Sequence, residues 1–237
     1  HYQPKVTLWG DGTWRLNSAE ALVRWQHPRL GFISPDSFIP LAEKTGLVHQ
    51  LTRYVLDDAL KQVAEWQRMG MDSSVAVNLS PLLLGRPNLP DEFAELAQAH
   101  GVEARRLIIE LTESAAMQDA ARSTEVLTRF RVKGFGLSLD DFGTGYSSLV
   151  HLHRLPFNEL KIDKSFVLEI GENPESEAIV KSIIGLGHSL GLKVCAEGVE
   201  SEAAMRQLDA LGCDYFQGYH ISKPVPSTDL IDMFANG

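Results

Sequence analysis

The sequence predicts an α/β fold, a (β/α)8 TIM-like barrel with the first strand antiparallel to the other seven. Short runs rich in β-branched residues alternate along the chain with stretches in which apolar residues recur every three or four positions. Each interval between successive runs is long enough for one helix, and such crossovers join parallel strands. The chain has 237 residues, close to the roughly 250 that are typical of this barrel. A doubly wound sheet is the alternative, but the chain lacks the Gly-rich first turn of that fold.

Two strands are predicted at the start of the chain, over residues 5–9 and 14–22. The connection between them is only Gly10-Asp11-Gly12 with a neighbour or two. Because a parallel connection needs a dozen or more residues, these two strands form an antiparallel hairpin. The first strand therefore runs opposite to the rest.

The turn also predicts the register of this hairpin. A turn centred on Asp11 pairs Gln3 roughly with Ala19. That pairing brings residues 2–4 beside Glu20 and Arg24, so we expect the start of the chain to lie at the same end of the barrel as those two side chains.

Six further strands follow, each a short buried run that ends in a polar residue. Their ranges are 75–78, 107–110, 137–140, 160–163, 193–197 and 214–217. Between strands, two apolar stripes predict the inner faces of helices: Leu47, Leu51, Val55, Ala59, Val63 and Trp66, then Ile179, Ile183, Leu186 and Leu190. Helix starts are predicted at Ser34-Pro35 and Asn173-Pro174, and helix ends at Gly70, Gly101, Gly191 and Gly212.

Charge and composition exclude several classes of protein. The chain carries 31 Asp and Glu against 22 Lys and Arg, a formal charge of -9, which disfavours a polymeric nucleic acid as partner. No apolar run approaches the roughly 20 residues of a membrane span. Cys195 and Cys213 belong to no metal or redox motif, so we expect two reduced core cysteines and a cytoplasmic location.

The first residues of the chain, His1-Tyr2-Gln3-Pro4, contain neither an initiator Met nor a signal-peptide pattern. We therefore expect residues 1–237 to form a single domain that was excised from a longer multidomain protein. The full-length protein could be anchored in a membrane and carry regulatory domains upstream.

Polar residues mark the ends of nearly all the predicted strands. They are Glu20, Asn78, Glu110, Asp140 with Asp141, Lys161 with Asp163, Glu197 and Gln217. For any one of them, capping of the following helix is an equally good explanation. It fails for the set, because Glu is a poor N-cap and because carboxylates that converge on one barrel mouth repel one another unless cations are present. The carboxyl ends of the strands are also where such barrels place their active sites.

The predicted strand ends therefore indicate a metal site. The candidate ligands are the oxygen donors Glu20, Asn78, Glu110, Asp140 and Asp141, with Glu197 in reach, and no His falls at a strand end. Such donors favour Mg²⁺ or Mn²⁺ over Zn²⁺ or Cu²⁺. The adjacent Asp140 and Asp141 suit two ions roughly 3.5–4 Å apart that share a carboxylate, as in phosphoester hydrolysis. Both can face the mouth only where the strand opens into its loop, which Gly143-Thr144-Gly145 allows.

A series of motifs runs in order along nearly the whole chain. It comprises Tyr2-Gln3-Pro4, Glu20-Ala21-Leu22 with Arg24, the stretch from Ser34 to Glu43, Val77-Asn78-Leu79-Ser80, Glu110-Leu111-Thr112-Glu113, the stretch from Asp140 to Ser148, Leu160-Lys161-Ile162-Asp163, Ala196-Glu197-Gly198-Val199-Glu200, Gln217-Gly218-Tyr219 and Lys223-Pro224. These motifs resemble those of the EAL domain, the bacterial cyclic di-GMP phosphodiesterase module. A match of three letters alone would be weak support for the resemblance, but an ordered series of this length is strong support.

The resemblance implies roles for the matching residues at the mouth. One ion is held by Glu20, Asn78, Glu110 and Asp140, and a second by Asp140, Asp141 and groups around Glu197. Glu197 resembles the general base of the family, and Lys161 a partner of the nucleophilic water and the phosphate. Arg24 resembles the phosphate contact, and Gln217 a hydrogen-bonding group behind the ligands.

The resemblance also implies roles around the mouth. Gln3, Pro4, Leu22 and Pro224 lie where members of the family contact the dinucleotide. Glu113 resembles the residue that braces the loop from Asp140 to Ser148, to which Gly143 and Thr144 belong and which couples the metal site to dimerisation. Glu200 and Asp163 are expected to support the site from behind, although Asp163 is equally well explained as a helix cap.

The function implied is the hydrolysis of cyclic di-GMP to linear 5'-pGpG by a homodimer with two Mg²⁺ or Mn²⁺ ions per site, which lowers the level of this second messenger. One alternative is a catalytically silent module that binds cyclic di-GMP as a sensor. Another is a different metal-dependent barrel enzyme, such as one that stabilises an enolate, since such enzymes also place carboxylates and a Lys at strand ends.

Overall fold

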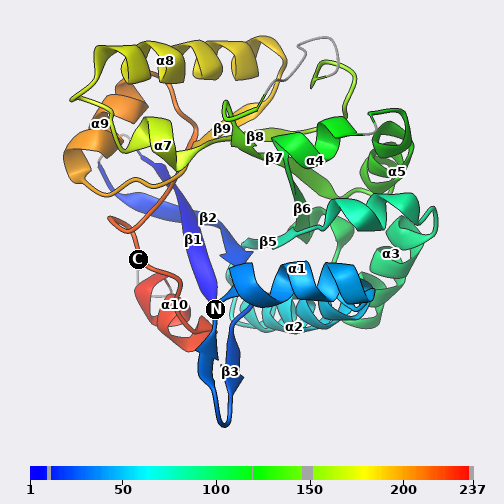
Figure 1. Cartoon of the computed structure of the whole chain (residues 1–237). Coiled ribbons are helices and arrows are strands. Elements are labelled where there is room, and N and C mark those ends of the chain that lie inside the picture. The colour runs from blue at the N-terminus through cyan, green and yellow to red at the C-terminus, as the bar shows by residue number, and fades with distance from the viewer. Residues whose placement is uncertain (10–11, 119, 146–151, 235–237) are drawn as a thin grey trace.

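Eight strands close into a barrel in the computed structural model, which describes residues 1–9, 12–118, 120–145 and 152–234. They are β1 (Tyr2–Leu8), β2 (Trp14–Ala21), β5 (Ser74–Asn78), β6 (Leu107–Thr112), β7 (Gly136–Phe142), β8 (Glu159–Ile162), β9 (Lys193–Ala196) and β10 (Tyr215–Gln217). The order around the barrel is β1, β10, β9, β8, β7, β6, β5, β2 (Figure 1). β1 is antiparallel to both of its neighbours, and the other pairs are parallel. The predicted barrel with a reversed first strand is confirmed.

A bulge in the first hairpin decides which of its side chains line the barrel. Near the turn, Val6 pairs with Leu16, which is the register that a turn centred on residue 11 predicts. The register shifts between Lys5 and Val6, so that Gln3 pairs with Glu20, and the expected pairing with Ala19 is wrong by one residue. One extra residue in a strand reverses the alternation of its side chains beyond that point. The bulge therefore turns Glu20 toward the interior. Residues 10–11 of the expected turn lie outside the described residues.

Several strand ends differ from the prediction. β7 continues to Phe142, whereas β8 ends at Ile162 and β9 ends at Ala196. Asp163 and Glu197 therefore lie just beyond their strands rather than in them. The last strand begins at Tyr215, one residue later than expected.

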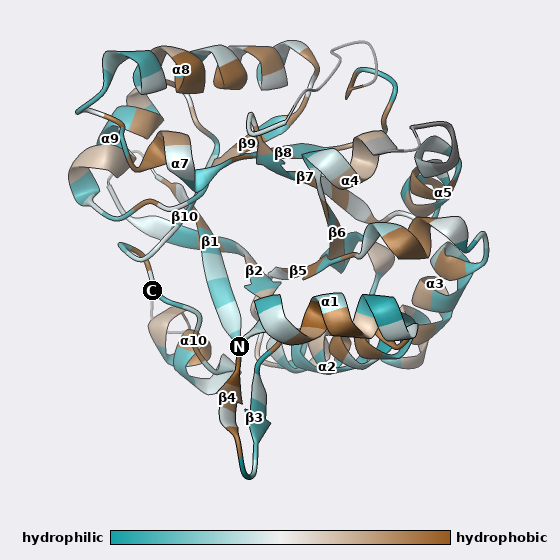
Figure 2. Ribbon diagram, in the orientation of Figure 1, coloured by the Kyte–Doolittle hydropathy of each residue, from teal (hydrophilic) through white to brown (hydrophobic). Residues whose placement is uncertain are grey.

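Helices surround the barrel, most of them in the crossovers between parallel strands (Figure 1). They are α1 (Pro35–Thr45), α2 (Val48–Arg68), α3 (Leu89–Ala99), α4 (Glu113–Gln118), α5 (Ala120–Val132), α7 (Lys164–Val167), α8 (Pro174–Ser189), α9 (Glu202–Ala210) and α10 (Ser227–Phe234). Figure 2 shows hydrophilic and hydrophobic residues side by side on these helices, as expected for elements with one face on the strands and one in solvent. A short hairpin of β3 (Trp25–His27) and β4 (Gly31–Ile33), which was not predicted, projects from the barrel.

The predicted helix boundaries are confirmed, but the predicted inner faces are only partly right. Ser34 and Asn173 are the residues that precede α1 and α8, and Gly70, Gly101, Gly191 and Gly212 all have positive φ beyond helix ends. On α2 the buried stripe includes Ala59, Val63 and Trp66, but Leu47 precedes the helix and is half exposed. On α8 the buried face centres on Val180, Ile184 and Gly187, so that Ile179 is exposed.

The close approach of α8 to β9 explains the rotated face. A Cβ atom at Gly187 would lie 2.5 Å from Cγ2 of Val194, whereas nothing lies within 4 Å of a Cβ at Gly185. The buried face of the helix therefore includes Gly187, whose lack of a side chain permits this close approach to Val194. Both cysteines are buried and unpaired, as expected. Within the described residues, no helix combines the length and the apolar character that crossing a membrane requires.

Candidate active site

The carboxyl ends of the strands bring the predicted acids together around one buried lysine. Lys161, near the end of β8, has no exposed surface. Its Nζ lies 2.7 Å from Oε1 of Glu197, 3.2 Å from carboxylate oxygens of both Glu110 and Asp140, and 3.5 Å from Oε2 of Glu20. Side chains from β2, β6, β7 and the end of β9 thus meet at the mouth, as the sequence predicted.

Glu20 is held on both sides by amide donors. Asn78, the last residue of β5, donates from Nδ2 to Oε1 of Glu20 at 2.7 Å. Gln217, the last residue of β10, donates from Nε2 to Oε2 of the same carboxylate at 2.7 Å and to Oε1 of Gln3 at 3.4 Å. The predicted residues Asn78, Gln217 and Gln3 therefore form one hydrogen-bonded arc around Glu20.

A bulge at the end of β7 places both aspartates at the mouth. Leu139 pairs with Leu160 and Phe142 pairs with Ile162, so β7 has one more residue than β8 over this stretch. Asp141 lies within it and adopts a φ of 55°, a left-handed conformation that is uncommon for a residue other than glycine. The expected opening of the strand thus occurs at the aspartates themselves, before Gly143.

The donor set at the mouth fits a divalent metal ion. Carboxylate oxygens of Asp140, Asp141 and Glu197 lie within 4.8 Å of one another. Glu20, Asn78 and Glu110 supply further oxygens close to Lys161. Oxygen donors of this kind bind Mg²⁺ and Mn²⁺, and the crowding of so many carboxylates is a second reason to expect cations here.

The electrostatics of the mouth differ between two of its buried glutamates, Glu20 and Glu110. Burial alone would raise the pKa of Glu20, but the Lys161 charge and the hydrogen bonds from Gln217 and Asn78 lower that pKa below its usual value. Burial raises the pKa of Glu110 well above its usual value despite the Lys161 charge. The donors around Glu20 therefore favour its ionised form. The positive charge near Glu110 does not offset the effect of burial, which disfavours the ionised form of that carboxyl group.

Glu197 and Asp141 also have raised pKa values. Burial raises the pKa of Glu197 to about 8, with Lys161 opposing the rise and Asp140 and Glu20 adding to it. Burial raises the pKa of Asp141 as well, together with the negative charges of Asp140 and Asp163. Perturbed carboxyl groups in a cleft are typical of functional sites.

Glu113 contacts the loop after β7, as predicted. Its carboxylate accepts a hydrogen bond from the backbone N–H of Gly143 at 2.9 Å, and a Cβ atom at Gly145 would lie 3.2 Å from the same group. Thr144 donates from its hydroxyl to the carbonyl of Asp141 at 2.9 Å. Residues 146–148 of the predicted loop lie outside the described residues.

Asp163 and Glu200 differ in how closely they relate to the mouth. Asp163 caps α7 by accepting from the backbone N–H of Ser165 at 2.9 Å, and it also contributes to the raised pKa of Asp141. The capping role of Asp163 is confirmed, and its supporting role at the mouth stays a prediction. Glu200 follows the end of β9 and is exposed.

The residues predicted to contact the ligand surround the start of β1 and the end of β2. Leu22 and Arg24 are half-buried and line a hollow of about 300 Å³ next to His1 and Tyr54. Gln3 faces Gln217, whereas Pro4 is buried on the opposite face of β1. Pro224 lies beside the start of the chain, where its carbonyl is 3.2 Å from Nδ1 of His1.

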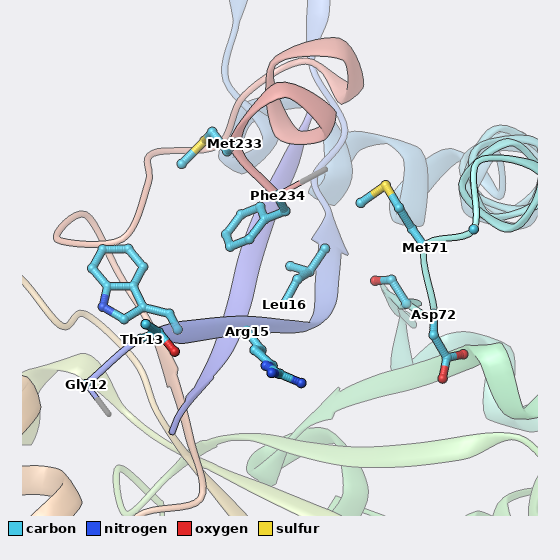
Figure 3. A pocket seen from close by; sticks show the side chains of 11 residues that line it. Gly12, Thr13, Arg15, Leu16, Met71, Asp72, Met233 and Phe234 are labelled. Atoms are coloured by element: carbon cyan, nitrogen blue, oxygen red, sulfur yellow. The ribbon is translucent and has the colours of Figure 1, made fainter. Parts of the chain in front are cut away.

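A second hollow, of about 910 Å³, lies at the opposite end of the barrel (Figure 3). Arg15 and Leu16 from β2, Met71 and Asp72 from the loop before β5, and Phe234 from the end of α10 line it. Asp72 is paired with Arg106. Among the described residues that line this hollow there is no predicted site residue and no cluster of acids, so we place the candidate site at the mouth.

Sequence reasoning missed a second buried charge pair below the mouth. Lys5 on β1 and Glu159 on β8 form an ion pair inside the barrel, and Ser138 on β7 joins it. The signal was present, because Glu159 precedes Lys161 by two residues and Ser138 precedes Asp140 by two, which places each on the inward face of its strand.

Comparisons with known proteins agree with this geometry. The model of the EAL domain family matches residues 1–224. The chain is 46% identical over 232 residues to the bifunctional diguanylate cyclase/cyclic di-GMP phosphodiesterase MucR of Pseudomonas aeruginosa, covering 98% of this chain and 33% of MucR. It is 39% identical over 227 residues to the cyclic di-GMP phosphodiesterase PdeR of Escherichia coli, covering 96% of this chain and 34% of PdeR. The chain thus spans about a third of the length of these relatives.

Solved structures show the same fold. The PaMucR phosphodiesterase in complex with c-di-GMP superimposes with a TM-score of 0.91 at 46% identity, covering 97% of this chain and 92% of that one. The EAL domain of Mycobacterium smegmatis DcpA gives a TM-score of 0.82 at 32% identity, covering 100% of this chain and 95% of that one.

Proposed function

Since this chain belongs to the EAL domain family, we propose that it hydrolyses cyclic di-GMP to linear 5'-pGpG with two Mg²⁺ or Mn²⁺ ions. The observation that carries the proposal is the convergence of Glu20, Glu110, Asp140 and Glu197 on Lys161 at one barrel mouth. The relatives MucR and PdeR are described as cyclic di-GMP phosphodiesterases, and the similar PaMucR structure is a c-di-GMP complex.

The acids at the mouth would hold the two ions. Glu20, Asn78, Glu110 and Asp140 would be the ligands of one ion, and Asp140, Asp141 and groups around Glu197 would hold the other. When bound, the ions would lower the pKa of a water molecule and stabilise negative charge on the phosphoryl oxygens. Neutralisation of these acids would also allow a ligand with two phosphates to approach an acidic chain.

The side chains of the protein orient the reactants and move the proton. Glu197 accepts a proton from the attacking water, whose oxygen forms a bond to phosphorus while the bond from phosphorus to the 3'-oxygen breaks in line. The leaving 3'-oxygen takes up a proton from solvent. Lys161 orients the water and the phosphate, and it holds Glu197 in place through their 2.7 Å contact. Arg24 offers a planar pair of donors suited to the phosphate.

The competing proposal is a sensor that binds cyclic di-GMP without cleaving it. Loss of a metal ligand or of the general base would favour that function. The mouth contains all of the predicted ligands together with Glu197 and Lys161, which supports the enzyme instead.

Product analysis separates these two functions. Freshly purified protein is incubated with cyclic di-GMP and Mg²⁺ or Mn²⁺, and the nucleotides are separated by chromatography. The enzyme predicts pGpG that forms only when a divalent cation is present. Bound but uncleaved cyclic di-GMP under every cation condition would favour the sensor.

We also propose that residues 1–237 act as a single domain of a longer protein.

The active form is proposed to be a homodimer. The resemblance to the EAL domain family implies that the loop after β7 couples the metal site to dimerisation, and the contact between Glu113 and Gly143 connects the mouth to that loop. Light scattering coupled to size exclusion measures the state of assembly, and a monomer with full activity would contradict the dimer.

A further inference from the structure

A buried ion pair lies one level deeper in the barrel than the acids of the mouth. Lys5 is almost fully enclosed, and its ammonium donates to both carboxylate oxygens of Glu159, at 2.5 and 2.6 Å. Ser138 donates from its hydroxyl to Oε1 of Glu159 at 2.9 Å. The ring of Tyr215 lies with its centroid 5.4 Å from Nζ of Lys5. The pair joins β1 to β8 across the interior, since β10 and β9 lie between those two strands.

Register places this pair next to one particular metal ligand. Glu110 on β6 is the direct partner of Ser138 on β7, and Ser138 is the direct partner of Glu159 on β8. Neighbouring residues of parallel strands present their side chains on the same face. Glu110 therefore lies at the level of the pair, one strand beyond the Ser138 hydroxyl that holds Glu159.

Stability alone does not explain a charge pair in this position. The interior of such barrels is usually filled by branched apolar side chains, and an apolar pair of similar volume is often as stable as a buried ion pair or more so. The pair is instead connected to the mouth. Ser138, which donates to Glu159, is the register partner of Glu110 on the neighbouring strand.

We propose that Glu159 is a positioning residue that holds the Lys5 ammonium away from Glu110, so that Lys5 does not add a second ammonium, beside that of Lys161, to a carboxylate needed for a divalent cation. The inference rests on the proposed metal-dependent function. Lysine has a flexible four-carbon stem and a compact charge, so that without the Glu159 carboxylate it turns to another acid. Glu110 is the neighbouring acid in register, and an ammonium bound there acts as an internal competitor of the metal ion.

The test is the affinity for Mn²⁺, measured by isothermal titration calorimetry on the metal-free chain without substrate. Glu159→Gln should weaken Mn²⁺ binding by about 10- to 100-fold, the range typical for partners of metal ligands. The double variant Lys5→Met with Glu159→Gln removes the competitor and should return the affinity to within about threefold of the unaltered chain. Glu177→Gln, an exposed change on α8, is the matched control and should bind Mn²⁺ normally.

The outcomes separate this inference from the proposed function. If the unaltered chain binds neither Mn²⁺ nor Mg²⁺, the proposed function itself is wrong. If that chain binds Mn²⁺ and folded Glu159→Gln binds it equally well, only the role of Glu159 is overturned. Equally weak binding by the single and double variants would also overturn it, because a purely structural role predicts no recovery.

A second variant covers the case in which Glu159→Gln does not fold, as judged by circular dichroism. Glu159→Asp keeps the charge but withdraws it from Lys5 by one methylene. The proposal expects weaker Mn²⁺ binding that Lys5→Met restores in the corresponding double variant. Affinity for Glu159→Asp equal to that of the unaltered chain would then contradict it.

Discussion

Lys161 is the residue around which the mouth is organised, because four carboxylates contact its ammonium. We expect Lys161→Met to lower turnover of cyclic di-GMP by at least about 100-fold, the loss typical of a missing electrostatic contact to the reacting group. The unfolding free energy of the metal-free protein should fall by about 3–5 kcal/mol, because buried charges lose their partner. Product chromatography and urea denaturation measure the two effects. Lys181→Met, at an exposed position of α8, is the control, and equal turnover by both variants would contradict the role of Lys161.

At the scale of single residues, the sequence reveals charged side chains at the ends of strands more readily than charged side chains deeper in the barrel. Glu20, Glu110 and Glu197 were found because a charged residue that ends an apolar run is conspicuous. Lys5 and Glu159 were missed because neither residue ends a predicted strand. The alternation along β8 places Glu159 on the inward face with Lys161, but the contact between Glu159 and Lys5 follows only from the three-dimensional structure.

Helix α8 contains two glycines, Gly185 and Gly187, that differ in how closely they approach the barrel. Gly187→Ala places a methyl group 2.5 Å from Val194 Cγ2, so the unfolding free energy should fall by about 1–3 kcal/mol, as for other overpacked cores. Gly185→Ala meets nothing within 4 Å and should instead raise that free energy by about 0.5–1 kcal/mol, since alanine favours a helix. Urea denaturation of both variants measures the difference. Destabilisation of equal size at both positions would mean that α8 does not approach β9 as closely as described.

Asp214 connects α8 to the last two strands and predicts a pH dependence. Its carboxylate accepts from the N–H of Val194 at 2.9 Å, from Lys193 at 2.6 Å and from His188 at 2.8 Å. Burial acts to raise the pKa of Asp214, but the donors, Lys193 foremost, lower it below its usual value. A lowered pKa stabilises the fold above the pKa of the unfolded chain, and that contribution is lost as the pH falls through the folded value.

Asp214→Asn should therefore lower the unfolding free energy by about 1 kcal/mol near pH 6. This is less than the loss of a fully buried charged hydrogen bond would cost, because the Asp214 carboxylate is partly exposed to solvent. The difference from the unaltered protein should shrink below about pH 4, where aspartates of the unfolded chain become protonated. Asp209→Asn, at an exposed position of α9, is the control. A difference that stays constant from pH 3 to pH 7 would contradict the assignment.

At the scale of elements, periodicity predicts where helices lie but not how they are rotated. The stripe from Ile179 to Leu190 has the correct spacing, yet the buried face is centred one position later, because the small Gly187 permits the closest contact. The alternation of apolar and polar residues along a strand likewise does not reveal where a bulge interrupts it. The bulges in β2 and β7 turn Glu20 and Asp141 toward the mouth, and neither follows from composition.

At the scale of the whole molecule, several acids converge at one end of the barrel, so cations that bind there should stabilise the fold. Mg²⁺ at about 100 times its dissociation constant should raise the unfolding free energy by about 2.7 kcal/mol, because only the folded chain forms the site. Thermal or urea denaturation with and without Mg²⁺ measures this gain. Asp140→Asn should remove most of it and Asp209→Asn none. An equal gain for Asp140→Asn would mean that the ions bind elsewhere.

The architecture of the whole molecule is the part that the sequence predicts most completely. The crossover lengths require parallel strands, and the three-residue turn requires the reversed first strand, so topology follows from chain connectivity alone. The formal charge of -9 was first an argument against a polymeric nucleic acid. The structure suggests a function for part of this negative charge, because several of the acids converge at the mouth, where cations would bind.

The central claim is that the acids at this mouth cleave cyclic di-GMP, with Glu197 as the general base. The most direct measurement compares Glu197→Gln with the unaltered chain for both pGpG formation and cyclic di-GMP binding in the presence of Mg²⁺. The account predicts that the variant binds the dinucleotide with similar affinity while turnover falls by about 100-fold or more. Turnover near that of the unaltered chain would contradict it.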